Sequence, residues 1–218
     1  MEKHSDDYQP GMLGNARSFV DAMRYHMVSF LAPSLQVAMN ELSNHDHSRF
    51  LTRTNHHVGR VNHLGSDAAS RDIHPEVMRE AVVMQMTWPG APTVYYGDEA
   101  GVCGFTDPDN RRTYPWGHED QELLAFHREM IRIHKKYPVL SHGSLKFLYG
   151  EHNVIAYGRF DMKERVIVAF HNGQGDKTFM LPVWQAGVCS ENRLRRVMLT
   201  GSWGYTTEPE EYFAEGGE

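Results

Sequence analysis

The sequence has few cysteines, no surplus of positive charge and no long apolar run, and each shortage excludes a class of protein. Its two cysteines, Cys103 and Cys189, are too few for a disulfide scaffold and favour a reducing compartment. Basic residues number 22 against 28 acidic ones, which argues against nucleic acid as a partner, because a phosphate backbone selects basic patches. No run approaches the roughly 20 apolar residues of a membrane helix, and residues 1–14 lack the apolar core of a signal peptide. We therefore expect a cytoplasmic protein that binds neither nucleic acid nor membrane.

The first part of the chain alternates predicted helices with short buried strands. Apolar residues recur at three- and four-residue spacing over residues 15–31, which predicts a helix. The further predicted elements follow in this order: a strand over 35–42, a loop over 51–72, a helix over 76–88, a strand over 91–99, a loop over 103–116 and a helix over 123–137. Helices that alternate with strands indicate a parallel sheet or barrel, so the fold class is predicted to be α/β.

After Pro138 the pattern changes to short β-rich segments separated by turn residues. The predicted strands are 144–150, 153–161, 165–173, 176–184 and 195–201. This pattern is typical of antiparallel sheets, which predicts one domain over residues 1–138 and a second over 139–218. The tail from residue 205 is acidic and is expected to add no closing strand, so the second domain should be incomplete.

Polar side chains gather where the two predicted strands end. Asn44, His45 and Asp46 follow the first strand, and residues 95–99 end the second. The loop after it adds further charges, namely Asp107, Asp109, Arg111 and Arg112. An aspartate accepts two hydrogen bonds and a histidine can donate one, so the pair suits vicinal sugar hydroxyls. An ionised carboxylate can also stabilise an oxocarbenium-like transition state. By itself, the short tripeptide is more typical of a capping aspartate beside a histidine that merely packs.

Other polar and aromatic residues allow more than one interpretation. Arg49 is expected to anchor the loop behind Asp46. Glu99 is expected to hold the loop after its strand, with a position lining the cleft as the alternative. Tyr114 and Trp116 could stack on a sugar, or they could belong to a core or a domain interface, and both alternatives stay open. Four histidines fit no metal-binding pattern and predict neither metal nor cofactor: His56, His57, His63 and His74.

Three segments together resemble one enzyme family. They are "LSNHDHSRFLT", "MTWPGAPTVYYGDEAG" and "GFTDPDNRRTYPW", in this order and with similar spacing to the family. The combination resembles the α-amylase superfamily of glycoside hydrolases, family 13, and is most similar to its neopullulanase, cyclomaltodextrinase and maltogenic amylase group. The resemblance covers about residues 15–200.

The resemblance implies a fold. Members have a (β/α)8 TIM barrel followed by an antiparallel β-sandwich domain. Residues 35–42 then resemble barrel strand seven and residues 91–99 strand eight. Residues 1–138 would be the C-terminal part of the barrel, and residues 139–218 the β-sandwich domain.

The resemblance also implies roles for five residues. Asp46 matches the aspartate that stabilises the transition state in these retaining enzymes. His45 and Asn44 would bind the same sugar, while Asp107 and Arg111 would contact sugars on the non-reducing side of the cleaved bond. The implied partner is an α-glucan oligosaccharide or a cyclodextrin.

The nucleophile motif of the family, of the form G-F-R-x-D, and its glutamate motif are missing. The segment "YGRFD", Tyr157–Asp161, is similar only superficially, since it lies among the predicted antiparallel strands. A retaining glycosidase needs two carboxyl groups about 5–5.5 Å apart. We therefore predict the C-terminal portion of a glycoside hydrolase that is inactive alone, with a non-catalytic α-glucan-binding or interaction module as the alternative. Self-association through uncovered barrel strands is also expected.

Overall fold

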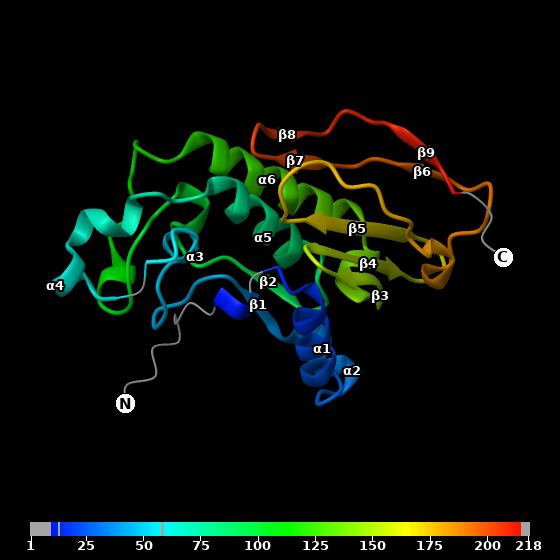
Figure 1. Cartoon of the computed structure of the whole chain (residues 1–218), viewed down its shortest axis with the longest axis horizontal. Helices are drawn as coiled ribbons and strands as arrows, with labels where there is room; N and C mark the ends of the chain where they lie inside the picture. Colours follow the sequence, from blue (N-terminus) through cyan, green and yellow to red (C-terminus); the bar gives the residue numbers. More distant parts are fainter. Residues whose placement is uncertain (1–9, 13, 58, 215–218) are drawn as a thin grey trace.

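The structure of the protein is a computed structural model that describes residues 10–12, 14–57 and 59–214 (Figure 1). The sequence of residues 1–14 predicts a loop, and most of that segment lies outside the described residues. The elements up to residue 142 are η1 Pro10–Met12, α1 Ala16–Met27, α2 Ala32–Val37, β1 Met39–Glu41, α3 Phe50–Arg53, α4 Val61–Leu64, η2 Ser66–Ser70, α5 Pro75–Thr87, β2 Ala91–Thr93, η3 Asp98–Ala100, η4 Asp109–Arg111, α6 Gln121–Lys136 and α7 Val139–His142. Those that follow are β3 Ser144–Glu151, β4 Val154–Phe160, β5 Arg165–His171, η5 Val183–Ala186, β6 Arg193–Arg195, β7 Leu199–Gly201, β8 Gly204–Thr206 and β9 Glu211–Phe213. None of the described helices is both long and apolar enough to cross a membrane.

Strands β1 and β2 form a short parallel pair. Asn40 lies opposite Pro92, and the register runs from Met39–Ala91 to Glu41–Thr93. The parallel arrangement was predicted, but the predicted strands over 35–42 and 91–99 are too long. Ala32–Val37 is a helix instead, because Pro33 occupies one of its first two positions, where a missing N–H costs nothing. Because the two strands run the same way, the segments that follow them start from the same edge.

The long helices α5 and α6 pack together and form the first core. Met78 and Val82 of α5 meet Phe126 and Met130 of α6, and Phe105 fills the space beside them. All five side chains are buried. Asp120 caps α6, since its carboxylate accepts from the backbone N–H groups of two first-turn residues. The helix predicted over 123–137 is confirmed, with bounds that differ by one or two residues at each end.

The region 51–72 is less irregular than predicted. It contains the short helical turns α3, α4 and η2. Asn55 fixes part of the connection, because its side-chain amide donates to the backbone oxygens of Ala68 and Arg71 at 3.2 and 2.9 Å. Short turns of this kind carry no long apolar period, which is why the sequence pattern missed them.

Strands β3, β4 and β5 form an antiparallel sheet that packs against α1 and the end of α5 (Figure 1). Two buried side chains of β4 reach α5. The Tyr157 hydroxyl lies 2.6 Å from Thr87 Oγ1, and Arg159 donates to the Thr87 and Gly143 carbonyls at 2.6 and 2.9 Å. "YGRFD" therefore lies in and just after an antiparallel strand, as predicted.

Two predictions for the C-terminal part are wrong. Residues 176–184 form no strand, and the proline at 182 instead precedes the 3-10 turn η5. The acidic tail does contain strands, since β8 pairs with β7 and β9 pairs with β6. Glu211 of β9 finds its partner in Arg193 of β6, with 3.3 Å between nitrogen and oxygen, so opposite charge accompanies this pairing.

Candidate functional site

The segment after β1 is a turn that Asn44 holds together. Its Oδ1 accepts from the backbone N–H groups of Asp46 and His47 at 2.9 and 3.0 Å, and its Nδ2 donates to Glu41 at 2.7 Å. This is the ordinary way in which asparagine stabilises a turn. Both ends of the Asn44 amide are thus engaged within the protein.

The same turn presents His45 and Asp46 outward. Each side chain is 67% exposed, and His45 Nε2 lies 3.6 Å from Asp46 Oδ2. An imidazole and a carboxylate at this spacing, both open to solvent, can bind one ligand together. The alternative of a packing histidine is excluded for His45 by its exposure.

The loop around η4 lies against this turn. Arg111 Nε is 2.8 Å from Asp107 Oδ1 and also donates to the backbone oxygen of His45 at 3.2 Å. Asn110 joins the two segments, since its Nδ2 donates to the backbone oxygens of Asn44 and His47 at 3.1 and 2.8 Å. The structure thus places all five residues that the resemblance implied in one region.

Arg49 anchors the loops, as predicted. Its fully buried guanidinium donates to the Asn110 oxygen at 2.8 Å, to the Tyr96 oxygen at 2.6 Å and to Asp98 at 3.0 Å. The rings of Tyr95 and Tyr96 lie 4.1 and 4.8 Å from its central carbon. One side chain therefore connects the segments that follow β1 and β2 with the loop of Asp107.

Asp98 supports this anchor from inside the protein. Burial raises the pKa of its carboxyl, while a hydrogen bond from Ser43 and the charge of Arg49 act in the opposite direction. The carboxyl is almost inaccessible, so it serves the fold and does not reach a ligand. Glu99 is also structural as predicted, since it accepts from the Gly97 N–H at 2.9 Å.

Glu41 and Asn110 belong to the site but were not found from the sequence. Glu41 precedes Asn44 by three residues, a spacing that could have suggested a side-chain pair. Asn110 carried no such signal, because its partners lie more than sixty residues away along the chain.

The remaining candidates are the two aromatic residues of the η4 loop and the histidines. Trp116 is 80% exposed, which excludes the core alternative for it, and its ring centroid lies 4.5 Å from that of Tyr114. Over the described ranges, no three histidine, cysteine or acidic side chains are close enough to hold a metal ion. His74 instead pairs with Glu76 at 2.9 Å.

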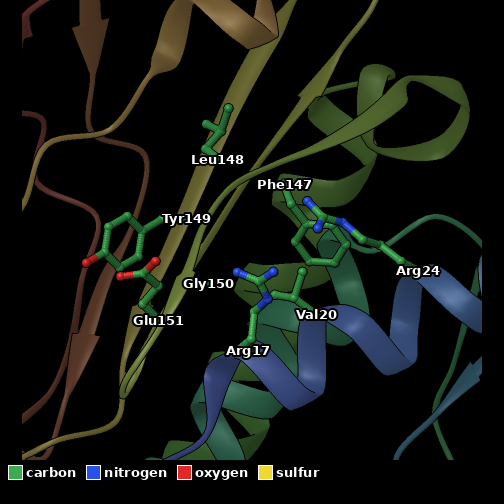
Figure 2. Close-up of a pocket in the computed structure, with 8 residues that line it drawn as sticks. All are labelled: Arg17, Val20, Arg24, Phe147, Leu148, Tyr149, Gly150 and Glu151. Atoms are coloured by element: carbon green, nitrogen blue, oxygen red, sulfur yellow. The ribbon is translucent and has the colours of Figure 1, made fainter.

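A separate groove of about 190 Å³ lies between α1 and β3 (Figure 2). Its arginines are engaged within the protein: Arg17 Nε lies 3.1 Å from Asp21, and Arg24 lies over the ring of Phe147 at 5.3 Å. The groove is therefore best described as the seam where α1 meets the antiparallel sheet.

Comparison with known proteins identifies the family. Residues 16–138 match the alpha-amylase catalytic domain. An amylopullulanase of Thermoanaerobacter thermohydrosulfuricus is 40% identical over 58% of this chain but only 8% of its own length. A cyclomaltodextrinase of a Bacillus species is 30% identical over 79% of this chain and 28% of its own length. The crystal structure of an acarbose-soaked debranching enzyme from Nostoc punctiforme matches with a TM-score of 0.68 at 26% identity, over 84% of this chain and 35% of that one.

The chain thus spans about a third or less of these proteins, and it shares an α/β fold with the solved one. The matched region contains both parallel strands and every residue of the candidate site. The chain belongs to the alpha-amylase family of glycosidases.

Proposed function

We propose that this chain is the C-terminal portion of a retaining glycoside hydrolase that acts on α-glucans. In this proposal β1 and β2 are barrel strands seven and eight, within residues 1–138, and residues 139–218 form the C-terminal β-sandwich domain. The parallel pairing of β1 with β2 and the antiparallel sheet after residue 143 support this arrangement. The names of the relatives, amylopullulanase and cyclomaltodextrinase, support an α-glucan oligosaccharide or a cyclodextrin as the ligand.

One observation carries the proposal. The exposed Asp46–His45 pair, 3.6 Å apart, follows a parallel strand, and the Asp107–Arg111 pair is hydrogen-bonded to the same turn. Functional groups in barrels gather at this end of the strands. Two adjacent pairs, each with a donor and an acceptor side chain, suit the many hydroxyls of neighbouring sugar rings.

Each residue then has a definite task. Asp46 accepts hydrogen bonds from two vicinal hydroxyls and stabilises the positive charge that develops on the ring. His45 donates to the same sugar, and Asn44 completes this binding position by holding the turn in shape. Asp107 and Arg111 bind the next sugar on the non-reducing side.

The chain alone is expected to bind without cleaving. A retaining glycosidase needs a nucleophile and an acid/base about 5–5.5 Å apart, and neither family motif occurs in the sequence. Asp161 of "YGRFD" is no substitute, because its carboxylate accepts from the backbone N–H groups of Lys163 and Glu164 at 2.6 and 2.8 Å. Asp46 matches the aspartate that stabilises the transition state, so it cannot serve as the nucleophile or as the acid/base.

The test combines activity with binding. The purified chain and its Asp46→Ala variant are incubated with pullulan, cyclodextrin and maltodextrin, and reducing ends are measured. We expect no release above the variant, while maltoheptaose binds the wild type about tenfold more tightly than Asp46→Ala, since a charged hydrogen bond contributes about 1.5–3 kcal/mol. Arg111→Ala should weaken binding as well.

Two results would contradict the proposal. Turnover that Asp46→Ala abolishes would show that the chain holds its own nucleophile and acid. A wild type that binds none of these glucans would remove the sugar site itself.

A non-catalytic α-glucan-binding module is the second candidate. The wide exposure of His45 and Asp46 favours it, because binding alone does not require an enclosed site. The two candidate functions predict different DNA upstream of Met1. An in-frame extension that encodes the nucleophile motif would support the enzyme.

A further inference from the structure

The loop that carries Asp107 and Arg111 continues to an exposed aromatic pair. Trp116 leaves 80% of its surface in solvent, although tryptophan usually buries most of its ring. The ring of Tyr114 lies beside it at a centroid distance of 4.5 Å and an interplanar angle of 47°. The broad apolar ring of Trp116 is therefore exposed to water, and the ring of Tyr114 supports it.

The scaffold holds this pair in place through Tyr114. Glu99 lies near enough to the Tyr114 hydroxyl to act on its pKa, and Glu99 in turn accepts from the Gly97 N–H at 2.9 Å. Desolvation and the negative charges of Glu99 and Glu119 all raise the pKa of this hydroxyl, which keeps it a donor. Tyr114 is thus tied to the segment that follows β2.

The same loop is fixed again just before the pair. The Tyr96 hydroxyl donates to the Arg112 oxygen at 2.9 Å, and the Arg112 guanidinium binds both Asp109 and the Ser66 oxygen at 2.8 Å. A ring on a loop with these restraints loses little conformational freedom when a ligand covers it. The pair is therefore pre-organised for binding.

The surroundings of Trp116 favour a sugar over a polypeptide as the ligand of its exposed ring. Its exposed neighbours are small or polar, namely Thr113, Gly117 and His118. A pyranose has the matching structure, with a C–H face that covers an aromatic ring and hydroxyls around its edge that stay hydrated. A surface that binds another polypeptide segment is expected to be a larger apolar patch.

We propose that Trp116, supported by Tyr114, stacks on a glucose ring of an α-glucan and forms a binding position in addition to that of Asp46 and His45. The choice of an α-glucan as the ligand rests on the proposed function. The position lies on the same loop as Asp107 and Arg111, so one glucan chain of sufficient length could occupy both regions.

The experiment compares two exposed tryptophans. Trp116→Ala is matched by Trp203→Ala, which removes a ring that is 62% exposed in the β7–β8 hairpin. Each variant, Asp46→Ala and the wild type are run through native gels with and without pullulan or amylopectin, and each is titrated with maltoheptaose. Trp116→Ala should bind about tenfold more weakly, and Trp203→Ala should bind as the wild type does. Tyr114→Phe, which keeps the ring and loses the hydroxyl that faces Glu99, should fall between them.

The outcomes separate this position from the Asp46 site. Wild-type binding by Trp116→Ala together with loss in Asp46→Ala overturns the stacking position and leaves the proposed function intact. Loss in Trp116→Ala with no change in Asp46→Ala supports stacking and contradicts the proposed role of Asp46. Equal losses in Trp116→Ala and Trp203→Ala overturn the inference, since any exposed ring would then suffice. A wild type that no glucan retards overturns both proposals.

Discussion

At the scale of single residues, Arg49 is the buried side chain that connects the loops of the candidate site. Its guanidinium is buried, lies against the rings of Tyr95 and Tyr96, and donates in three directions. Only a planar group with several fixed donors can satisfy these partners at once. A lysine would keep the charge and lose most of the hydrogen bonds and the stacking.

Arg49→Lys should therefore lower the free energy of unfolding by about 3 kcal/mol, because it leaves Asp98 and two backbone oxygens poorly paired in the interior. Urea unfolding followed by circular dichroism measures the change. The matched control is Arg17→Lys, whose ion pair with Asp21 is exposed, and it should change stability by no more than about 0.5 kcal/mol. Similar midpoints for both variants would contradict the anchoring role.

The sequence allowed the five site residues to be chosen because they follow predicted strands and match a family motif. It could not show what holds them. The partners of Arg49 and Asn110 lie about fifty to sixty-six residues away, so local patterns carry no trace of these hydrogen bonds. It also could not show that the Asn44 amide is engaged by its own turn.

At the scale of elements, the seam between α1 and β3 depends on a glycine. A Cβ atom at Gly150 would lie 2.6 Å from Val20 Cγ2, closer than side chains normally approach. Figure 2 shows the two residues facing each other across the seam. The absence of a side chain at this position lets α1 approach the strand.

Gly150→Ala should destabilise the protein by about 1–3 kcal/mol, since the added methyl overpacks this contact. Val20→Ala should relieve much of that cost in the double variant, so thermal unfolding of the four proteins should show strong coupling. Gly11→Ala is the control, because no atom lies within 4 Å of its added Cβ. Additive effects at 150 and 20 would rule out this contact as the cause.

The elements also show where local pattern is sufficient. Helix α6 was predicted well, because its apolar stripe has a clear period and Asp120 caps it. The strand expected over 176–184 failed although its pattern was apolar, since a strand needs a partner and Phe179 packs on Tyr149 instead, at 5.5 Å. Strand β9 was missed because its acidic sequence pairs with the basic strand β6, an interaction between distant segments.

At the scale of the whole molecule, the segment from Tyr25 to Met39 is an apolar face without a cover in this structure. Six large apolar side chains along it are between 53% and 82% exposed: Tyr25, Val28, Phe30, Leu31, Val37 and Met39. Among the described strands β1 pairs only with β2, although parallel sheets are normally buried on both faces. The relatives that match this chain are about three or more times as long, so further polypeptide is available in them to cover such a face.

The isolated chain should therefore self-associate through this face at micromolar concentration, because water contact with six apolar side chains is unfavourable and an unpaired strand edge offers further hydrogen bonds. Sedimentation velocity between about 5 and 100 µM should show a rising mean sedimentation coefficient for the wild type. Leu31→Glu combined with Val28→Lys should reduce the association by placing charges in the contact. Trp203→Glu is the control, since Trp203 is 62% exposed in the β7–β8 hairpin, which lies on the opposite side of the molecule from α1 and α2 (Figure 1), and it should associate as the wild type does. Equal association of all three proteins would assign the contact to another surface, and a wild type that stays monomeric would show that α1, α2 and β1 tolerate water without a partner.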